Sequence, residues 1–242
     1  MSTASLYFSG LSRPVMLAIS FLTIGVFVLG LLYKFRIWGQ GGTAWLEDPQ
    51  DTGIMNFIKN ILHNLTPSHG IKKFVMNGLL ELREFKQSKF RWFMHMSIFW
   101  GFIMLFGLSF FMFIAEFTVS HEMYLTIRDS IHVAAFGDFF GFLLLAGIIL
   151  AIFNRIYNKQ TNRTSSAYDW TGLILLLVIT VTGFIAEWAR PAYFGFGASQ
   201  ELALFHSAIS LIFIAIIPYT KLIHLIAAPI TQLTYSFEEE EG

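Results

Sequence analysis

The chain has 242 residues with 16 basic and 16 acidic side chains, so its net charge is zero and no basic surface for nucleic acid is expected. Only 13% of the residues are charged, against about 25% in a typical soluble domain, and 55% are hydrophobic. No cysteine is present, which excludes disulfides, thiolate-bound iron–sulfur clusters and covalently attached c-type haem.

Five apolar runs are long enough to cross a bilayer, which takes about 20 residues per helix. They cover residues 14–33, 92–115, 131–153, 170–186 and 202–227. Helices are expected because open strands leave backbone groups unsatisfied in lipid. The sequence therefore predicts an all-α, five-helix integral membrane bundle, a single domain over residues 1–242, in a multi-pass protein of the cell membrane.

Two features refine this prediction at the ends of the chain. Residues 1–12 lack the basic start and small-residue cleavage site of a signal peptide, so the first span is expected to be retained. Pro218 is expected to kink the last span, because proline has no N–H and crowds the preceding turn.

The distribution of basic residues predicts the orientation. Lysine and arginine gather between spans one and two and between spans three and four, whereas the opposite side offers only Arg13, Arg128 and Arg190. Because basic loops stay in the cytoplasm, the N-terminus is expected outside and the C-terminus inside. Segment 35–91 would be cytoplasmic, and residues 56–63 and 71–85 are either interfacial helices or ordinary amphipathic connectors.

Four histidines fall within the predicted spans: His95, His132, His206 and His224. Ionisable side chains at membrane depth are costly, by roughly 2.5 kcal/mol or more when charged, and are candidates for function. His95 and His224 are predicted near the inner surface, and His132 and His206 near the outer one. Each pair suits a haem iron ligated from both faces, and the alternative is polar residues satisfied between helices.

The interval from His206 to His224 fits this interpretation. Eighteen residues make five helical turns, so on an ideal helix both side chains point the same way, about 27 Å apart along the axis. That distance is close to the thickness of the hydrocarbon core, and a kink at Pro218 would modify it. His121, in the predicted outer loop, is an alternative to His132 as a ligand, or part of a quinone pocket.

The last span, HSAISLIFIAIIPYTKLIHLIAAP at residues 206–229, resembles the final helix of the nitrate reductase gamma-subunit family of membrane cytochromes b. In that family two histidines at this spacing flank the segment that contains Pro218 and Lys221. The segment FRWFMHMSIFWGF at residues 90–102 resembles the family's ligand-bearing second helix. The segments YFSGLS, at residues 7–12, and FRWFMHM are most similar to the cytochrome b subunits of membrane-bound heterodisulfide reductases.

The resemblance implies two b-type haems, with His95 and His224 on the inner one and His206 on the outer one. It also implies a cytoplasmic iron–sulfur partner protein and a lipid-soluble quinol or methanophenazine near the outer haem. The sequence departs from the nitrate reductase branch at Leu105, where that branch has the second outer ligand. The outer haem is then absent or takes another ligand, and depth selects His132.

The chain would then be an electron-transfer subunit, with the substrate-converting site on a partner. Alternatives are a transporter or proton relay that uses buried histidines, and a membrane anchor without redox function. Basic side chains expected at haem propionates are Lys221 and Arg91 inside and Arg190 outside, unless they only follow the positive-inside rule or reach to the interface.

Oxidation of a quinol or phenazine also needs a proton acceptor. The candidates on the predicted outer side are Glu116, His121, Asp129 and Glu187, and Trp188 is a candidate to stack on a flat ring.

Overall fold

The computed structural model describes residues 12–39, 54–65, 71–72, 74–188 and 200–234, and these residues form helices and the turns between them. Five helices are long and apolar enough to cross a membrane: Pro14–Trp38, Lys89–Thr118, Ile131–Tyr157, Ala167–Trp188 and Leu202–Tyr219. The predicted all-α class with five such helices is confirmed. The predicted orientation of the two termini stays a prediction.

The chain divides into two compact units, Met1–Tyr7 with Ser88–Ile209 and Phe8–Gln87 with Ser210–Gly242. The first unit holds α5 (Lys89–Thr118), α6 (His121–Arg128), α7 (Ile131–Tyr157), α8 (Lys159–Thr164) and α9 (Ala167–Trp188). The second holds α1 (Ser12–Trp38), α2 (Ile54–Leu65), α4 (Leu82–Gln87) and α11 (His224–Thr234). Helix α10 (Gln200–Ile216) contributes to both, and the prediction of a single domain stays a prediction.

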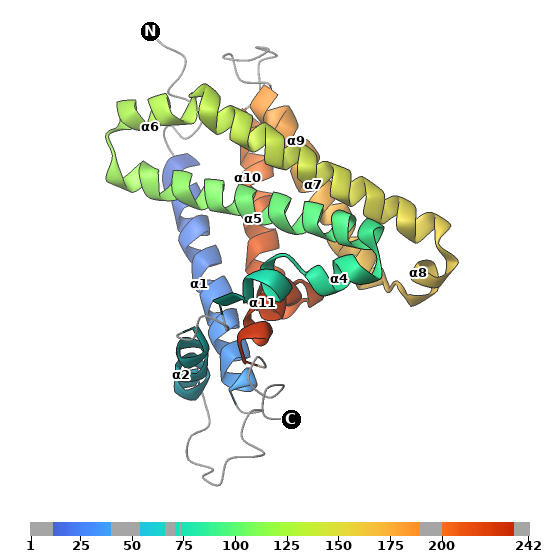
Figure 1. Ribbon diagram of the computed structural model, residues 1–242. Helices are drawn as coiled ribbons and strands as arrows, with labels where there is room; N and C mark the ends of the chain where they lie inside the picture. The colour runs from blue at the N-terminus through green and yellow to red at the C-terminus, as the bar shows by residue number, and fades with distance from the viewer. Residues whose placement is uncertain (1–11, 40–53, 66–70, 73, 189–199, 235–242) are drawn as a thin grey trace. The chain divides into compact units, whose positions relative to one another are not determined.

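In the first unit, α5 and α7 lie side by side (Figure 1). Gly101 permits their close approach, because a Cβ at this position would lie 2.7 Å from the Leu144 Cβ. Small residues are common where membrane helices meet, since they let the backbones approach. Arg155, in the last turn of α7, donates to the backbone oxygen of Asp169 at 2.6 Å, with its guanidinium carbon 5.7 Å from the Trp170 ring centre. These contacts fix the start of α9 against the end of α7.

Serine residues start three helices of this unit. The Oγ atoms of Ser88, Ser120 and Ser130 each accept a hydrogen bond from the backbone N–H three residues on, at 3.3 Å. Serine is favoured there because the first N–H groups of a helix have no partner within the helix. The caps set where α5, α6 and α7 begin and hence the depth of the side chains that they carry.

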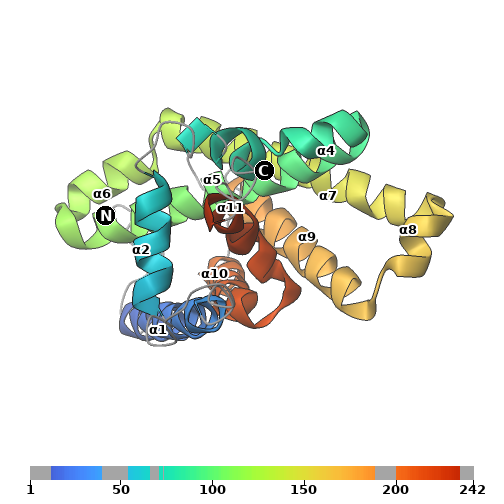
Figure 2. The same cartoon turned by 60° about the horizontal axis from the view of Figure 1, so that its bottom comes forward.

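In the second unit, α2 lies beside the C-terminal end of α1 (Figure 2). The ring of Phe57 is 5.3 Å from that of Phe35 and 6.0 Å from that of Trp38, centre to centre. The helix expected at residues 56–63 is therefore present and packs through an aromatic cluster. Residues 71–85 form no single helix, since a π-helix, Phe74–Leu79, is separated from α4 by Glu81, whose φ is 44°.

The last predicted span is broken rather than merely kinked. A 3₁₀ turn, Ile217–Tyr219, follows α10, Thr220 is extended with φ −119° and ψ 177°, and a second 3₁₀ turn, Lys221–Ile223, leads into α11. Pro218 stands at the break, as expected from its missing N–H. The Tyr219 hydroxyl donates to the Val26 backbone oxygen of α1 at 3.0 Å. The ideal-helix phase and length between His206 and His224 therefore do not apply.

Candidate functional site

An aromatic cluster occupies the junction of α7 and α9, at the end of the first unit that the basic residues predict to face outward. The Phe142 ring centre is 4.7 Å from that of Phe184 and 6.2 Å from that of Trp188, and the last two are 5.2 Å apart. Phe184 is buried, whereas Phe142 is 51% exposed. The cluster thus has one face in the protein and one open to a molecule that arrives from the lipid.

The backbone of α7 approaches α9 closely beside this cluster. A Cβ at Gly141 would lie 2.7 Å from Cζ of Phe184, and one at Gly137 would lie 3.6 Å from Oε2 of Glu187. At Gly141, only glycine leaves this space without a shift of the neighbouring ring. The half-buried Glu187 carboxylate therefore lies against the backbone of α7, next to the aromatic rings.

Asp138 is an acidic residue inside the third predicted span. It is the one carboxylate between Ile131 and Phe153, and its Oδ1 is buried without a hydrogen-bond partner among the described residues. A signal for it was present in the sequence. Ionisable residues inside a predicted span are candidates for function whatever their type, so Asp138 meets the same criterion as the four histidines.

His206 is held by the neighbouring helix α9. Its Nδ1 lies 3.1 Å from the Thr182 Oγ1, and that hydroxyl also lies 2.8 Å from the backbone oxygen of Val178. The single hydroxyl hydrogen goes to the carbonyl, which can only accept. A second backbone oxygen, that of Ile179, lies 3.1 Å from the same hydroxyl. With the hydroxyl hydrogen on one of these two carbonyls, Thr182 accepts from Nδ1–H, and Nε2 carries the lone pair that a metal needs.

The same reasoning fixes the tautomer of His224, in the second unit. Its Nδ1 lies 2.6 Å from the backbone oxygen of Lys221, and a carbonyl only accepts. Nδ1 therefore donates, and Nε2 again carries the lone pair. The turn Lys221–Ile223, which the break of the last span creates, is what brings this carbonyl to the ring.

The other predicted ligands lie in the first unit. His95 is half-buried in α5 with a buried Nδ1, and His132 is exposed in the first turn of α7. His121, the alternative to His132, is the exposed first residue of α6. His95 and His224 belong to different units, so their pairing stays a prediction, as does that of His132 with His206.

The remaining candidates are placed as follows. Arg91 and Lys221 are exposed, in the first turn of α5 and in the 3₁₀ turn before α11, and Arg190 lies outside the described residues. Glu116 is half-buried near the end of α5. Asp129 receives two hydrogen bonds from Arg128, at 2.8 and 3.0 Å. Both Asp129 oxygens are thus engaged by the Arg128 guanidinium in an ion pair.

Within the part of the chain that the structure describes, no three His, Asp or Glu side chains gather as a metal site. A haem iron, however, takes only one or two axial ligands from the protein. The tautomers of His206 and His224 fit that role, because each leaves Nε2 as the electron-pair donor and anchors the ring through Nδ1.

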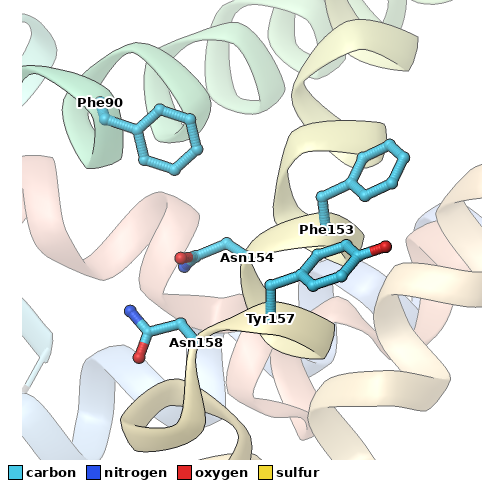
Figure 3. Close-up of a pocket in the computed structure, with 5 residues that line it drawn as sticks. All are labelled: Phe90, Phe153, Asn154, Tyr157 and Asn158. Carbon is cyan, nitrogen blue, oxygen red and sulfur yellow. The ribbon is translucent and has the colours of Figure 1, made fainter.

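A pocket of about 470 Å³ lies at the opposite end of α7. It is lined by Phe90, Phe153, Asn154, Tyr157 and Asn158. Figure 3 shows the amides of Asn154 and Asn158, at the end of α7, on the side that faces Phe90. None of the predicted site residues lines it, and amide groups cannot take up a proton as a carboxylate does. Transfer of a proton from a bound carrier therefore favours the junction of α7 and α9 over this pocket.

Comparison with known proteins gives one family. Residues 71–232 match the model of the HdrE family, which is described as a subunit of dihydromethanophenazine:CoB–CoM heterodisulfide reductase. The chain is 34% identical over 261 aligned positions to the corresponding protein of Methanosarcina barkeri, covering 96% of this chain and 98% of that protein. It is 33% identical to the corresponding protein of Methanosarcina thermophila, with the same coverage.

A more distant likeness joins part of the chain to a larger protein. Over 188 aligned positions, 61% of this chain and 25% of the other, it is 27% identical to the EtfAB:quinone oxidoreductase of Syntrophomonas wolfei. No solved structure matches significantly.

Proposed function

Because this chain belongs to the HdrE family of heterodisulfide reductase subunits, we propose that it is a two-haem b-type cytochrome that carries electrons between a lipid-soluble carrier and an iron–sulfur partner protein. The carrier would be a quinol or methanophenazine, and the partner would lie in the cytoplasm. The names of the relatives supply the carrier and the complex; the five apolar helices and the histidine tautomers of this chain support the rest.

The observation that carries the proposal is the hydrogen bond from His206 to Thr182. It orients an imidazole at membrane depth and leaves Nε2 as the donor atom, which is what an axial haem ligand requires. We assign His206 and His132 to an outer haem and His95 and His224 to an inner one. When bound, a haem with two imidazole ligands supplies one-electron transfer without an open coordination position.

Basic side chains complete the proposed haem sites. Lys221 lies three residues before His224, whose ring binds its carbonyl, and Arg91 lies four residues before His95, about one helical turn. Either side chain can therefore reach the edge of a flat group bound at its histidine and donate to a propionate. Arg190 has the corresponding role at the outer haem.

The carrier site would lie at the outward end of the first unit, where Glu187 and Trp188 meet α7. The aromatic cluster provides a surface for a flat ring, and the Glu187 carboxylate provides a proton acceptor beside it. Thr182, which holds His206, lies five residues before Glu187 on α9, a rise of about 7.5 Å. A carrier at the cluster would therefore lie close to the proposed outer haem. Glu116 and His121 are the other candidates for this site.

The haem assignment is tested by the haem content and visible spectrum of the purified protein. Changing His206 or His224 to Ala should remove about half of the haem, because in each variant one of the two haems loses one of its two axial ligands. His63→Ala, on α2, is the matched control and should keep both haems. Reduced protein without b-type absorption bands would overturn the function. If His132→Ala keeps both haems while His121→Ala loses one, His121 is the fourth ligand.

The carrier site is tested by the rate at which a reduced quinone or phenazine analogue reduces the haem. Glu187→Gln and Glu116→Gln proteins that keep both haems should react more slowly wherever the carboxylate takes the proton. Equal rates in both variants and the wild type would remove these two residues from the mechanism.

A further inference from the structure

Asp138 presents a buried carboxylate oxygen that no described residue satisfies. Its helix, α7, is apolar on both sides of it, and Asp138 lies seven residues into the helix, about 10 Å along its axis. Buried polar atoms are nearly always hydrogen-bonded, so an unmatched acceptor at this depth calls for a donor. A bound molecule with an O–H or N–H group would supply one.

The position of Asp138 on α7 identifies what it faces. Near Asp138, three positions of α7 lie against α9: Gly137 faces Glu187, and Gly141 and Phe142 face Phe184. Successive residues of a helix are rotated by about 100° around its axis. With Gly137 set at 0°, this face extends through Gly141 at about 40° to Phe142 at about 140°. Asp138, at about 100°, falls within it. Asp138 therefore belongs to the face of α7 that packs on α9.

The level of Asp138 along the helix pair is also fixed. Phe184 packs at Gly141 and Glu187 at Gly137, so the two helices run antiparallel. Residue numbers rise along α9 in the direction in which they fall along α7. Asp138 is thus level with Glu187 and Trp188, beside the aromatic cluster. The Asp138 and Glu187 carboxylates and the aromatic cluster therefore lie at one level of the α7–α9 pair.

We propose that Asp138 binds the reduced carrier by accepting a hydrogen bond from its O–H or N–H group, and takes that proton when the carrier is oxidised. Oxidation of one carrier molecule breaks two such bonds and yields two protons and two electrons. The electrons pass singly to acceptors of the haem class, and each proton passes to the Asp138 carboxylate and onward past Glu187. This inference rests on the proposed function, because it assigns the carrier's polar contact within the same site.

A measurement of carrier binding tests the hydrogen bond to Asp138 separately from the proton transfer. Equilibrium dialysis of detergent-solubilised protein without oxygen would compare dihydrophenazine with its 5,10-dimethyl derivative, which has the same rings but no N–H. Wild type should bind dihydrophenazine about tenfold more tightly than Asp138→Leu does, because a charge-assisted hydrogen bond is lost. The dimethyl compound should bind both proteins about equally.

Kinetics then test the proton transfer. Asp138→Asn keeps an acceptor oxygen but cannot take a proton, so it should retain most of the binding while haem reduction slows by about 100-fold. Asp129→Asn removes a carboxylate that is already paired with Arg128 and should change neither quantity. Haem content, measured first, shows that each variant has folded.

The outcomes are distinct. Haem-loaded Asp138→Asn and Asp138→Leu proteins that bind and react like wild type would overturn the inference and leave the proposed function intact. A loss of binding that Arg190→Gln reproduces in protein that keeps both haems would also overturn it, since Asp138 would then serve an ion pair. Absence of haem from the wild-type protein would instead count against the proposed function, whereas the dialysis result would still report on Asp138.

Discussion

Replacing Thr182 by valine tests the tautomer of His206 directly. Valine has the shape of threonine without the hydroxyl, so His206 loses the acceptor 3.1 Å from its Nδ1 while the packing of α9 is kept. Loss of such a partner typically weakens metal binding by about 10- to 100-fold, equivalent to about 1.4–2.8 kcal/mol. The outer haem should therefore bind more weakly by that factor, and the inner haem should be unaffected.

Thr180 offers a matched control on the same helix. Its Oγ1 donates to the Leu176 backbone oxygen at 2.8 Å, as that of Thr182 does to Val178, and its side chain is buried within the first unit. Thr180→Val thus removes an equivalent intrahelical hydrogen bond without touching His206. Thr182→Ser, which keeps the hydroxyl, should restore haem binding.

The assay is a titration of haem-depleted protein with haem, followed by absorbance, for the wild type and the three variants. A two-step titration in which Thr182→Val weakens one step by that factor and leaves the other unchanged would support the reasoning. Equal haem affinities in Thr182→Val and Thr180→Val would refute it, because the hydrogen bond to His206 would then have no effect on ligation.

Two further predictions concern the stability of the fold, measured by reversible unfolding in detergent. Gly141→Ala should destabilise the protein by about 1–3 kcal/mol, because its Cβ would lie 2.7 Å from the buried Phe184 ring, whereas Gly107→Ala, with nothing within 4 Å, should cause no such loss. Equal stabilities of these two variants would contradict the close packing of α7 on α9. Tyr219→Phe should cost about 1 kcal/mol, because the hydroxyl that binds the Val26 oxygen is removed, and a stability equal to wild type would mean that this bond does not anchor the broken span to α1.

The five apolar helices could be predicted from the amino-acid sequence, since lipid offers no partner for backbone groups and a long apolar run can satisfy them only as a helix. The histidines and the weak point at Pro218 could be identified in the same way. Hydropathy and motif are local properties, and each can be recognised in a single segment of the chain.

Which side chains meet depends on the tertiary structure. The acceptor that fixes the His206 tautomer comes from Thr182, 24 residues earlier, and the carbonyl at His224 is in place only because the last span breaks at Thr220. The surroundings of Asp138 are likewise tertiary, because Gly137 and Gly141 of α7 let Glu187 and Phe184 of α9 pack beside it. The contacts of α9 with α7 and α10 depend on the rotation and close approach of two helices, which periodicity along one helix does not specify.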